Sequence, residues 1–393
     1  MEKSYLVNAN TVLEKDYFCV IPKNGSTEVG WYQNSVISQN PPPEIPLDME
    51  YSFNKTTWYK YTKGTDITTT APIYFRGNNT SFVSGGSFSM GFIYLKVDNT
   101  VDLAGRINSL SKKWSYDGAA TEMPPIYHGV STGIPTLMFN KNPYIRSIAD
   151  LRLNWNITDT DTTNIQLKTY QYMFYGCENL IDTPKFQCTA TAYVQDYSHA
   201  LFGSMFSGCT SLTTVSDLSN ITITPYCFQA MFNGCTALTT ISHDLLPATT
   251  LAEGCYQLMF NGCKALTKAV VLPATILAEK CYDRMFYNCR ALTEVPALYA
   301  TVLPTDCYKQ MFTMANGGGD IPYVYFDLFS AASQPTFNDY QLPYSGTITD
   351  SYSSSIKMFG YADAYGYISI NTQYKIGKYV NGSYSSVSII GQI

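Results

Sequence analysis

A short motif returns six times in the middle of the chain, and its spacing limits the folds that the chain can adopt. Two copies, "CYQLMFNGCKALT" (255–267) and "CYDRMFYNCRALT" (281–293), are almost identical. The methionines that align the copies lie at intervals of 32, 26, 28, 26 and 26 residues: Met173, Met205, Met231, Met259, Met285 and Met311. A repeat of this length is typical of a solenoid, in which each copy buries its apolar side against its neighbours.

Each copy contains an apolar pattern followed by a β-branched segment. In the copy at 255, the residues Cys255, Met259, Cys263 and Leu266 stand at offsets of 0, 4, 8 and 11, which predicts a helical stripe of one or two turns. The segments "LTTISHDLL" (238–246) and "LTEVPAL" (292–298) are typical of short extended strands. We therefore expect a unit of short helix plus strand, stacked several times.

The outermost copies differ from the consensus, as expected of units that cap a stack. The first copy has Thr169 and the second has Leu201 where the others have a leading cysteine. The sixth copy has Ala315 in place of the second cysteine and then runs into glycines. Because Thr and Leu replace cysteine in this column, the pattern favours a packing role for the thiols.

Ten of the 11 cysteines lie in or between the repeats. A bridge within one copy, such as Cys255–Cys263, is excluded if the segment is helical, because eight residues rise about 12 Å. A ladder of bridges between copies remains open if the copies stack at strand spacing. Zinc sites usually need two cysteines separated by two to four residues, and the sequence has no such pair. The three histidines, His128, His199 and His243, are scattered along the chain. We expect buried free thiols that fill a tight core.

The composition favours an extracellular or virion β-protein. Charged residues make up 14% of the chain, tyrosine alone occurs 33 times, and the net charge is −5. No dense block of Lys and Arg is present, so a nucleic-acid partner is not expected. No run of 18 apolar residues could span a membrane, and the first 23 residues do not resemble an export signal.

The repeat resembles the BspA-like leucine-rich repeat of surface proteins of gut Bacteroidetes and of the crAss-like bacteriophages that infect them. The residues that carry this resemblance are the run from Cys255 through "LPATILA" (272–278), and the match extends over 169–316. Residues 49–110, with "YFRGNNTSF" at 74–82, resemble the region that precedes these repeats in the same family. The resemblance implies a right-handed solenoid, no catalytic residues, and a role in attachment or recognition.

The predicted fold is mainly β with short helices, in four parts. Residues 1–46 form an N-terminal docking segment and proline linker, and residues 47–125 form a small β-sandwich-like domain. The leucine-rich repeat solenoid covers 126–316, with "LRLNWNIT" (151–158) as an early repeat strand. A small C-terminal β domain covers 317–393, with a hairpin in "KYVNGSYSSV" (378–387) that turns at Asn381-Gly382.

Other motifs give weaker indications of chemistry. Asp159 and Asp161 could suggest a calcium loop, but the glycine and distal glutamate of an EF-hand are missing. Gly317–Gly319 is not followed by the Lys-Ser/Thr of a phosphate loop. The C-terminal tyrosines could stack on sugars or could form an ordinary sheet face. No catalytic, cofactor-binding or metal-binding residue is therefore expected, and no cofactor.

The sequence favours a non-enzymatic bacteriophage virion protein, such as a fibre, spike or capsid decoration, which displays its repeats for host recognition. Its expected partners are other virion proteins through the N-terminal segment, a host glycan or protein receptor, and other copies in a trimer. The alternative is a bacterial cell-surface adhesin whose export signal is absent here. A glycan-degrading enzyme is less favoured and needs two carboxylates about 5–10 Å apart in one groove.

Overall fold

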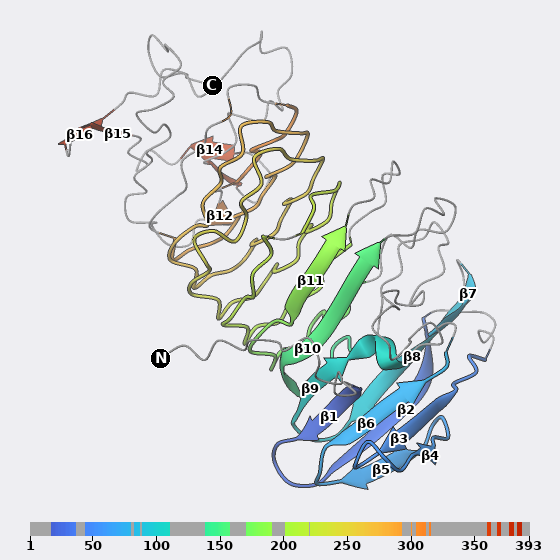
Figure 1. Ribbon diagram of the computed structural model, residues 1–393. Coiled ribbons are helices and arrows are strands. Elements are labelled where there is room, and N and C mark those ends of the chain that lie inside the picture. The colour runs from blue at the N-terminus through green and yellow to red at the C-terminus, as the bar shows by residue number, and fades with distance from the viewer. Residues whose placement is uncertain are drawn as a thin grey trace, which may run out of the picture.

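The protein is mainly β in the part of the chain that its computed structural model describes (Figure 1). Described are residues 17–36, 44–79, 82–86, 89–110, 138–157, 170–190, 201–219, 221–292, 300 and 304–311, and the backbone of five short strands after residue 313. The one helix among them is the 3₁₀ turn η1 (Ile107–Leu110). None of the described helical segments is long and apolar enough to cross a bilayer.

Two β-sheets form the N-terminal part of the molecule. The larger sheet has the strand order β11-β10-β9-β1-β6-β3-β4 and the smaller sheet has the order β5-β2-β8-β7. The strands of the larger sheet are β1 (Phe18–Pro22), β3 (Met49–Ser52), β4 (Tyr59–Lys60), β6 (Ile73–Gly77), β9 (Val101–Arg106), β10 (Ile145–Ile157) and β11 (Lys185–Ala190). The strands of the smaller sheet are β2 (Thr27–Val36), β5 (Asp66–Thr69), β7 (Val83–Gly86) and β8 (Ser89–Val97).

The core of this part lies between the two sheets. Alternate residues of β9 are buried, as expected of a strand with one face against a core. Trp31 of β2 is fully buried, and its ring centroid lies 5.7 Å from that of Phe18 in β1 and 5.8 Å from that of Phe75 in β6. These aromatic contacts join the sheets across the core.

The predicted boundary at residue 46 is wrong for the described residues before it. β1 lies inside the larger sheet, where it pairs with β6 and β9, and β2 lies inside the smaller sheet between β5 and β8. Ile45, in the expected proline linker, is 2% exposed, and its amide donates to the side chain of Gln33. The pairing partners lie far along the chain, so the local sequence did not reveal them.

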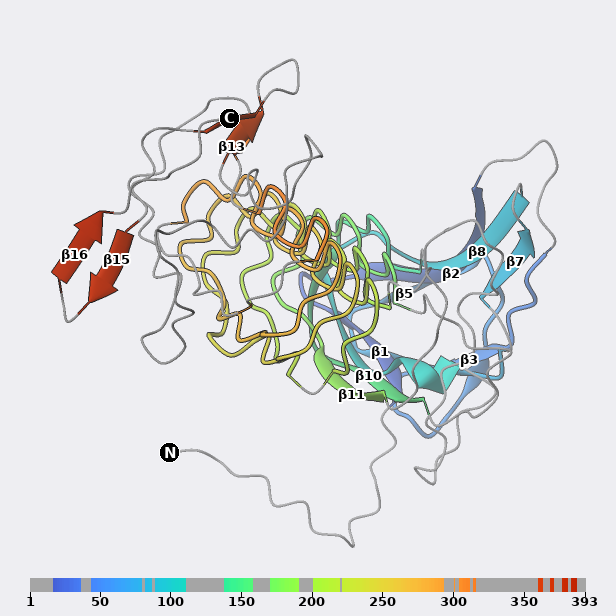
Figure 2. The same ribbon diagram turned by 90° about the horizontal axis from the view of Figure 1, so that it is seen from above.

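The predicted helix in each repeat is also wrong. In the copy at 255, the amides of Gln257, Met259 and Cys263 donate to carbonyls three residues earlier, which makes a run of tight turns. The amides between them cross to the next repeat. Tyr256, Leu258, Phe260 and Gly262 donate to Cys281, Asp283, Met285 and Tyr287, at 2.8–3.0 Å. An α-helix would use both sets internally, so this backbone instead joins successive repeats, which are seen stacked in Figure 2.

Left-handed backbone recurs every fourth residue in these turns. Around the copy at 255, the positive φ angles are +56° at Gly254, +58° at Leu258 and +72° at Gly262. A left-handed residue with a side chain costs about 1–2 kcal/mol, and the hydrogen bond to the next repeat offsets this cost. The true spacing of the stripe is therefore four residues, not the 3.6 of a helix. The segment 238–246, predicted as a strand, contains no strand, and a bridge pairs Thr250 with Ile276 nearby. The predicted strand 292–298 lies outside the described residues except for Leu292.

Two ladders of stacked rings run through the repeats. One ladder consists of Tyr170, Phe202, Phe228, Tyr256, Tyr282 and Tyr308, with adjacent centroids 5.6–5.9 Å apart. The other consists of Phe139, Phe174, Phe206, Phe232, Phe260 and Phe286, at 5.1–5.8 Å. Equivalent aromatic side chains of adjacent repeats are thus buried against one another. A single repeat could not make these contacts alone.

Each turn of the repeat around its Met-Phe pair is called a coil below and is named by its methionine. The second ladder reveals one coil that the sequence analysis missed. Met138 and Phe139 occupy the Met-Phe position of an earlier coil, and Lys141 has the left-handed φ of +51° that Gly176 has in the next one. Asn142 stands where the following coil has Cys177. From this coil the chain continues into β10, which pairs in parallel with β9 and with β11. The prediction of a strand at 151–158 is confirmed for the described residues 151–157, which belong to β10.

Five short strands are described after residue 313. β12 (Met314–Ala315) pairs in parallel with β13 (Gly360–Ala362), which pairs antiparallel with β14 (Ile368–Ile370). β15 (Gly377–Val380) pairs antiparallel with β16 (Ser383–Ser386), and Val380 lies opposite Ser383. This pairing confirms the predicted hairpin, while Asn381 and Gly382 themselves lie outside the described residues.

Candidate functional site

The cysteines of the repeats are buried packing groups. The ten described cysteines are free and buried, and the nine in the repeats are 0% exposed. In the second cysteine column each thiol donates to a phenylalanine carbonyl of the preceding coil. The Sγ of Cys209 lies 3.1 Å from the oxygen of Phe174, and that of Cys263 lies 3.2 Å from the oxygen of Phe232. The thiols therefore add a hydrogen bond between coils.

Burial also makes these thiols poor nucleophiles. Removal from water raises the pKa of Cys177, Cys227, Cys281 and Cys289 from 9.0 to about 12. The reactive and metal-binding form of cysteine is the thiolate, which is scarce at neutral pH when the pKa is so high. The predicted packing role is confirmed for these cysteines, while the side chain of Cys188 lies outside the described residues.

The other residues considered as sites are widely separated or lie outside the described residues. His243 is exposed and contacts Asp244, with Nδ1 2.7 Å from the carboxylate. No group of three or more His, Cys, Asp or Glu in the described part of the chain could hold a metal ion. His128, His199, Asp159, Asp161, Gly317–Gly319 and the side chains of the C-terminal tyrosines lie outside the described residues.

A polar spine that the sequence analysis missed runs along the coils. Nε2 of Gln229 donates to Oε1 of Gln257 at 2.6 Å, and Nε2 of Gln257 donates to Asp283 at 2.7 Å. Asp283 is 2% exposed and also accepts two hydrogen bonds from Arg284 at 3.0 Å. The carboxylate beside it raises the pKa of the Arg284 guanidinium. The buried charge of Asp283 is therefore hydrogen-bonded by its neighbours in the spine. These bonds fix the alignment of adjacent coils.

One tyrosine is hydrogen-bonded to a carboxylate of the next coil and lies within the electrostatic influence of a second carboxylate. The hydroxyl of Tyr226 donates to Glu253, and burial together with the charges of Glu253 and Glu279 raises the pKa of Tyr226. These acidic groups come from the same position of successive repeats, two residues before the leading cysteine. Neither of them lines the pocket that is described below.

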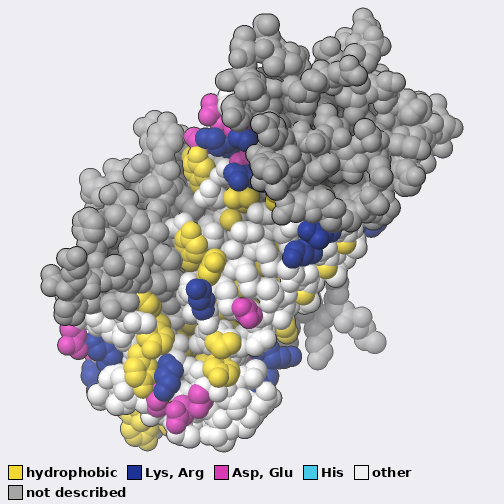
Figure 3. Space-filling model, turned by 180° about the vertical axis from the view of Figure 1, so that it is seen from behind, with side chains coloured by type: hydrophobic (Ala, Val, Ile, Leu, Met, Phe, Trp, Pro, Cys, Tyr) yellow, Lys and Arg dark blue, Asp and Glu magenta, His cyan; other side chains and the backbone are white. Residues whose placement is uncertain are grey.

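The outer face of the coils presents threonine hydroxyls. Thr213, Thr239 and Thr267 follow the leucine column and are exposed. The hydroxyls of Thr213 and Thr267 donate to Ile181 and Thr239 in the preceding coil, each at 3.2 Å. Their oxygens still face solvent and can accept hydrogen bonds. Figure 3 shows one face of the molecule, on which uncharged atoms predominate among the described residues and charged side chains are scattered.

An exposed aromatic group lies at the β3–β4 edge of the larger sheet. Tyr51 contacts Phe53 and Tyr59, with ring centroids 5.8 and 5.4 Å apart, and these two neighbours are 43% and 49% exposed. Nearby, the guanidinium of Arg76 lies 4.1 Å from the ring centroid of Trp58. Exposed rings of this kind are suited to contact with a partner or a flat sugar face.

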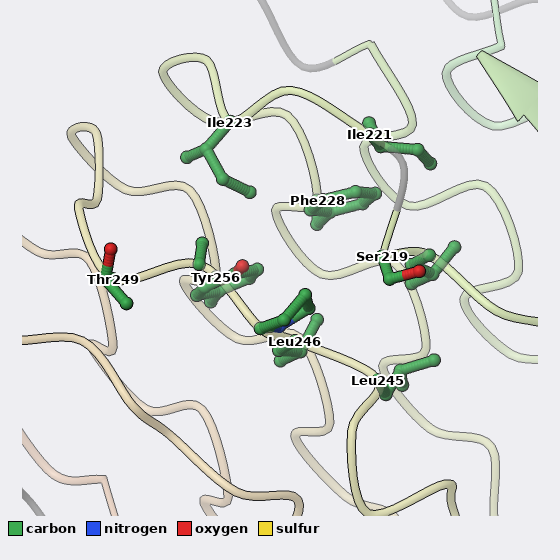
Figure 4. A pocket seen from close by; sticks show the side chains of 11 residues that line it. Ser219, Ile221, Ile223, Phe228, Leu245, Leu246, Thr249 and Tyr256 are labelled. Carbon is green, nitrogen blue, oxygen red and sulfur yellow. The ribbon is translucent and has the colours of Figure 1, made fainter. Parts of the chain in front are cut away.

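A half-open pocket of about 250 Å³ lies where the segments that lead into the Met231 and Met259 coils meet (Figure 4). Its lining residues are Leu218, Ser219, Ile221, Ile223, Phe228, Leu245, Leu246, Pro247, Ala248, Thr249 and Tyr256. Most of these residues are apolar, and none of the described lining residues is charged.

Comparison with known proteins places the chain in no family. No family model matches it, and no curated protein and no solved structure is detectably similar.

Proposed function

We propose that this chain is a non-enzymatic structural protein of a bacteriophage virion, a fibre, spike or capsid decoration that displays a leucine-rich repeat surface for host recognition. Its architecture in this proposal is an N-terminal β-sandwich-like domain, a BspA-like solenoid over 126–316, and a small C-terminal β domain. The N-terminal residues would contact other virion proteins, and the outward parts would contact a host glycan or protein receptor.

The observation that carries the proposal is the division between the inside and the outside of the coils. Inside, the methionines, thiols and rings of each repeat pack against the equivalent side chains of neighbouring repeats. The ladders through Phe232 and Tyr256 are examples. Outside, the repeats present short, uncharged hydroxyls such as Thr239 at regular intervals. Such a surface supports recognition by many weak polar contacts rather than by a single reactive group.

The exposed rings of Tyr51, Phe53 and Tyr59 add a second surface, at some distance along the chain from the repeats. Aromatic side chains are enriched where proteins meet partners. Assembly into a trimer and contact with a receptor are both compatible with such a group.

Mass spectrometry of gradient-purified particles of the encoding phage tests the proposal. The chain should be present at a constant copy number per particle. Its presence only in lysate of infected cells would contradict the proposal, and its presence on uninfected bacteria would favour the adhesin. Loss of a host capsule sugar on incubation with the pure chain would instead favour a glycan-degrading enzyme.

The docking end can be tested by truncation, with a limit that the structure sets. Deletion of residues 1–16 leaves β1 and β2 intact and should release the chain from particles while its circular dichroism is unchanged. Deletion of residues 1–40 would remove Phe18 and Trp31 from the core and so cannot test docking. Deletion of 377–393, which removes the β15–β16 hairpin, is the matched control and should leave the chain on the particle.

A further inference from the structure

The half-open pocket between the Met231 and Met259 coils has an apolar floor and three hydroxyl-bearing lining residues, Ser219, Thr249 and Tyr256. Its floor is formed by the buried side chains Leu218, Phe228, Leu245 and Leu246, each at most 3% exposed. Its rim carries the exposed residues Ser219 and Thr249. The absence of charge among the described lining residues disfavours an ionised ligand, because a charge there would lose its hydration without a partner.

We call the hydroxyl of Tyr256, which Figure 4 shows among the lining side chains, the anchor of the pocket. Tyr256 is 1% exposed as a residue, its hydroxyl is not among the fully buried polar atoms, and no hydrogen bond joins this hydroxyl to the described residues. Its ring is held between those of Phe228 and Tyr282, with centroids 5.9 and 5.8 Å away. Because Tyr256 lines the pocket, its hydroxyl can donate a hydrogen bond to water or to a ligand there.

The coils on the two sides of the pocket differ in the residue type that they contribute to this ring ladder. The same column holds phenylalanine in the two preceding coils, Phe202 and Phe228, and tyrosine in the three coils from Tyr256 onward. The pocket therefore lies where the column changes from an apolar to a hydroxylated ring. Burial raises the pKa of Tyr256 well above its usual value, so the hydroxyl keeps its proton and acts as a donor.

The volume sets the size of the ligand. An engineered apolar cavity of about 150 Å³ is known to take up benzene. The volume here, about 250 Å³, is large enough for a six-membered ring with a small substituent. A ring fills the apolar floor, and its substituent can accept the proton of the Tyr256 hydroxyl.

We propose that this pocket binds a small uncharged ring compound with one oxygen acceptor, of the phenol class, with its ring against Leu245 and Leu246 and its oxygen at the hydroxyl of Tyr256. This goes beyond display of the outer face and does not depend on where the protein is located.

The test uses the full chain with 4-fluorophenol and fluorobenzene as probes, followed by ¹⁹F NMR titration. We expect saturable binding of one 4-fluorophenol per chain. Tyr256→Phe should weaken its binding about fivefold, the size of one uncharged hydrogen bond, and leave fluorobenzene unchanged. Tyr282→Phe, which makes the same change one coil away outside the pocket lining, should affect neither probe.

Location is tested by filling the cavity. Ala248→Leu should abolish binding of both probes, and nuclear Overhauser contacts from the bound probe to the methyl groups of Leu245 and Leu246 give the same information if that variant fails to fold. The proposal is overturned if neither probe saturates, if contacts to those methyl groups are missing, or if Tyr256→Phe and Tyr282→Phe weaken 4-fluorophenol equally. None of these outcomes depends on virion association.

Discussion

The ring of Phe139 stacks on the ring of Phe174 with centroids 5.1 Å apart and planes inclined by 9°. Phe139 also contacts Phe18 of β1 at 5.9 Å and Trp31 of β2 at 6.5 Å. The core between the two sheets and the ring ladder of the repeats are therefore one continuous core. The β-sheets close the N-terminal end of the coil stack, where an uncapped coil would expose its apolar side.

Replacement of Phe139 should weaken both halves of the molecule. Phe139→Ala removes a ring that is 1% exposed, and we expect a loss of about 3–5 kcal/mol in the free energy of unfolding. Hydrogen exchange should give the same opening free energy for β2 and the Met259 coil in the native chain, and different values in the variant. Phe53→Ala, at an exposed ring, is the control and should cost less than about 1 kcal/mol. Equal effects of the two substitutions would contradict a shared core.

The coil thiols should be inert until the protein unfolds. Because their pKa values are raised by burial and their Sγ atoms are 0% exposed, a disulfide reagent at pH 7.5 should label them only at the rate of unfolding. Mass spectrometry after labelling in increasing urea measures this. Rapid labelling of Cys235 or Cys263 in the native protein would show that the coils open locally.

Stability should fall at alkaline pH. Buried Cys289 has a pKa raised from 9.0 to about 12, so its contribution is fully present below pH 9, where the unfolded thiol is also protonated. Above pH 9 the unfolded thiol ionises while the folded thiol does not, and unfolding is favoured by about 1.4 kcal/mol per pH unit per thiol up to about pH 12. Urea midpoints between pH 7.5 and 11 measure the loss. Cys289→Ala should be less stable at pH 7.5 yet lose less as the pH rises, and parallel curves would refute the assignment.

The glycine before the second cysteine is required by its backbone. Gly262 has a φ of +72°, and a Cβ there would lie 3.7 Å from Gly234, so space is sufficient and conformation alone decides the cost. Gly262→Asn should be tolerated, because Asn288 holds the equivalent place with a φ of +59°. Gly262→Val should cost at least about 2 kcal/mol, because a β-branched residue disfavours this region. Thermal unfolding of the two variants would show the order, and equal stability would contradict a left-handed backbone.

Several features could be predicted from local sequence because they depend on columns that repeat in the chain. The Met-Phe spacing placed the stacked units, the burial of Cys255 and Leu266 followed from their spacing, and the Asn-Gly pair indicated the hairpin of β15 and β16. The recurring glycine before the second cysteine, as at Gly234 and Gly262, was also visible. It is a poor helix residue at a fixed place and could have indicated turns instead of a helix.

Only the tertiary structure decided how the backbone hydrogen bonds are divided. Local spacing distinguishes poorly between a period of 3.6 and a period of four, and the choice depends on the amide of Phe260 reaching the carbonyl of Met285 in the next coil rather than one in its own segment. The place of β1 was hidden for the same reason, since Phe18 pairs with Phe75 across 57 residues of chain. The pocket anchor, Tyr256, likewise became recognisable only when the coils were stacked. The sequence by itself determined which side chains are buried. The backbone conformation that buries them depends on hydrogen-bond partners that lie a repeat or more away along the chain, and only the tertiary structure supplies these partners.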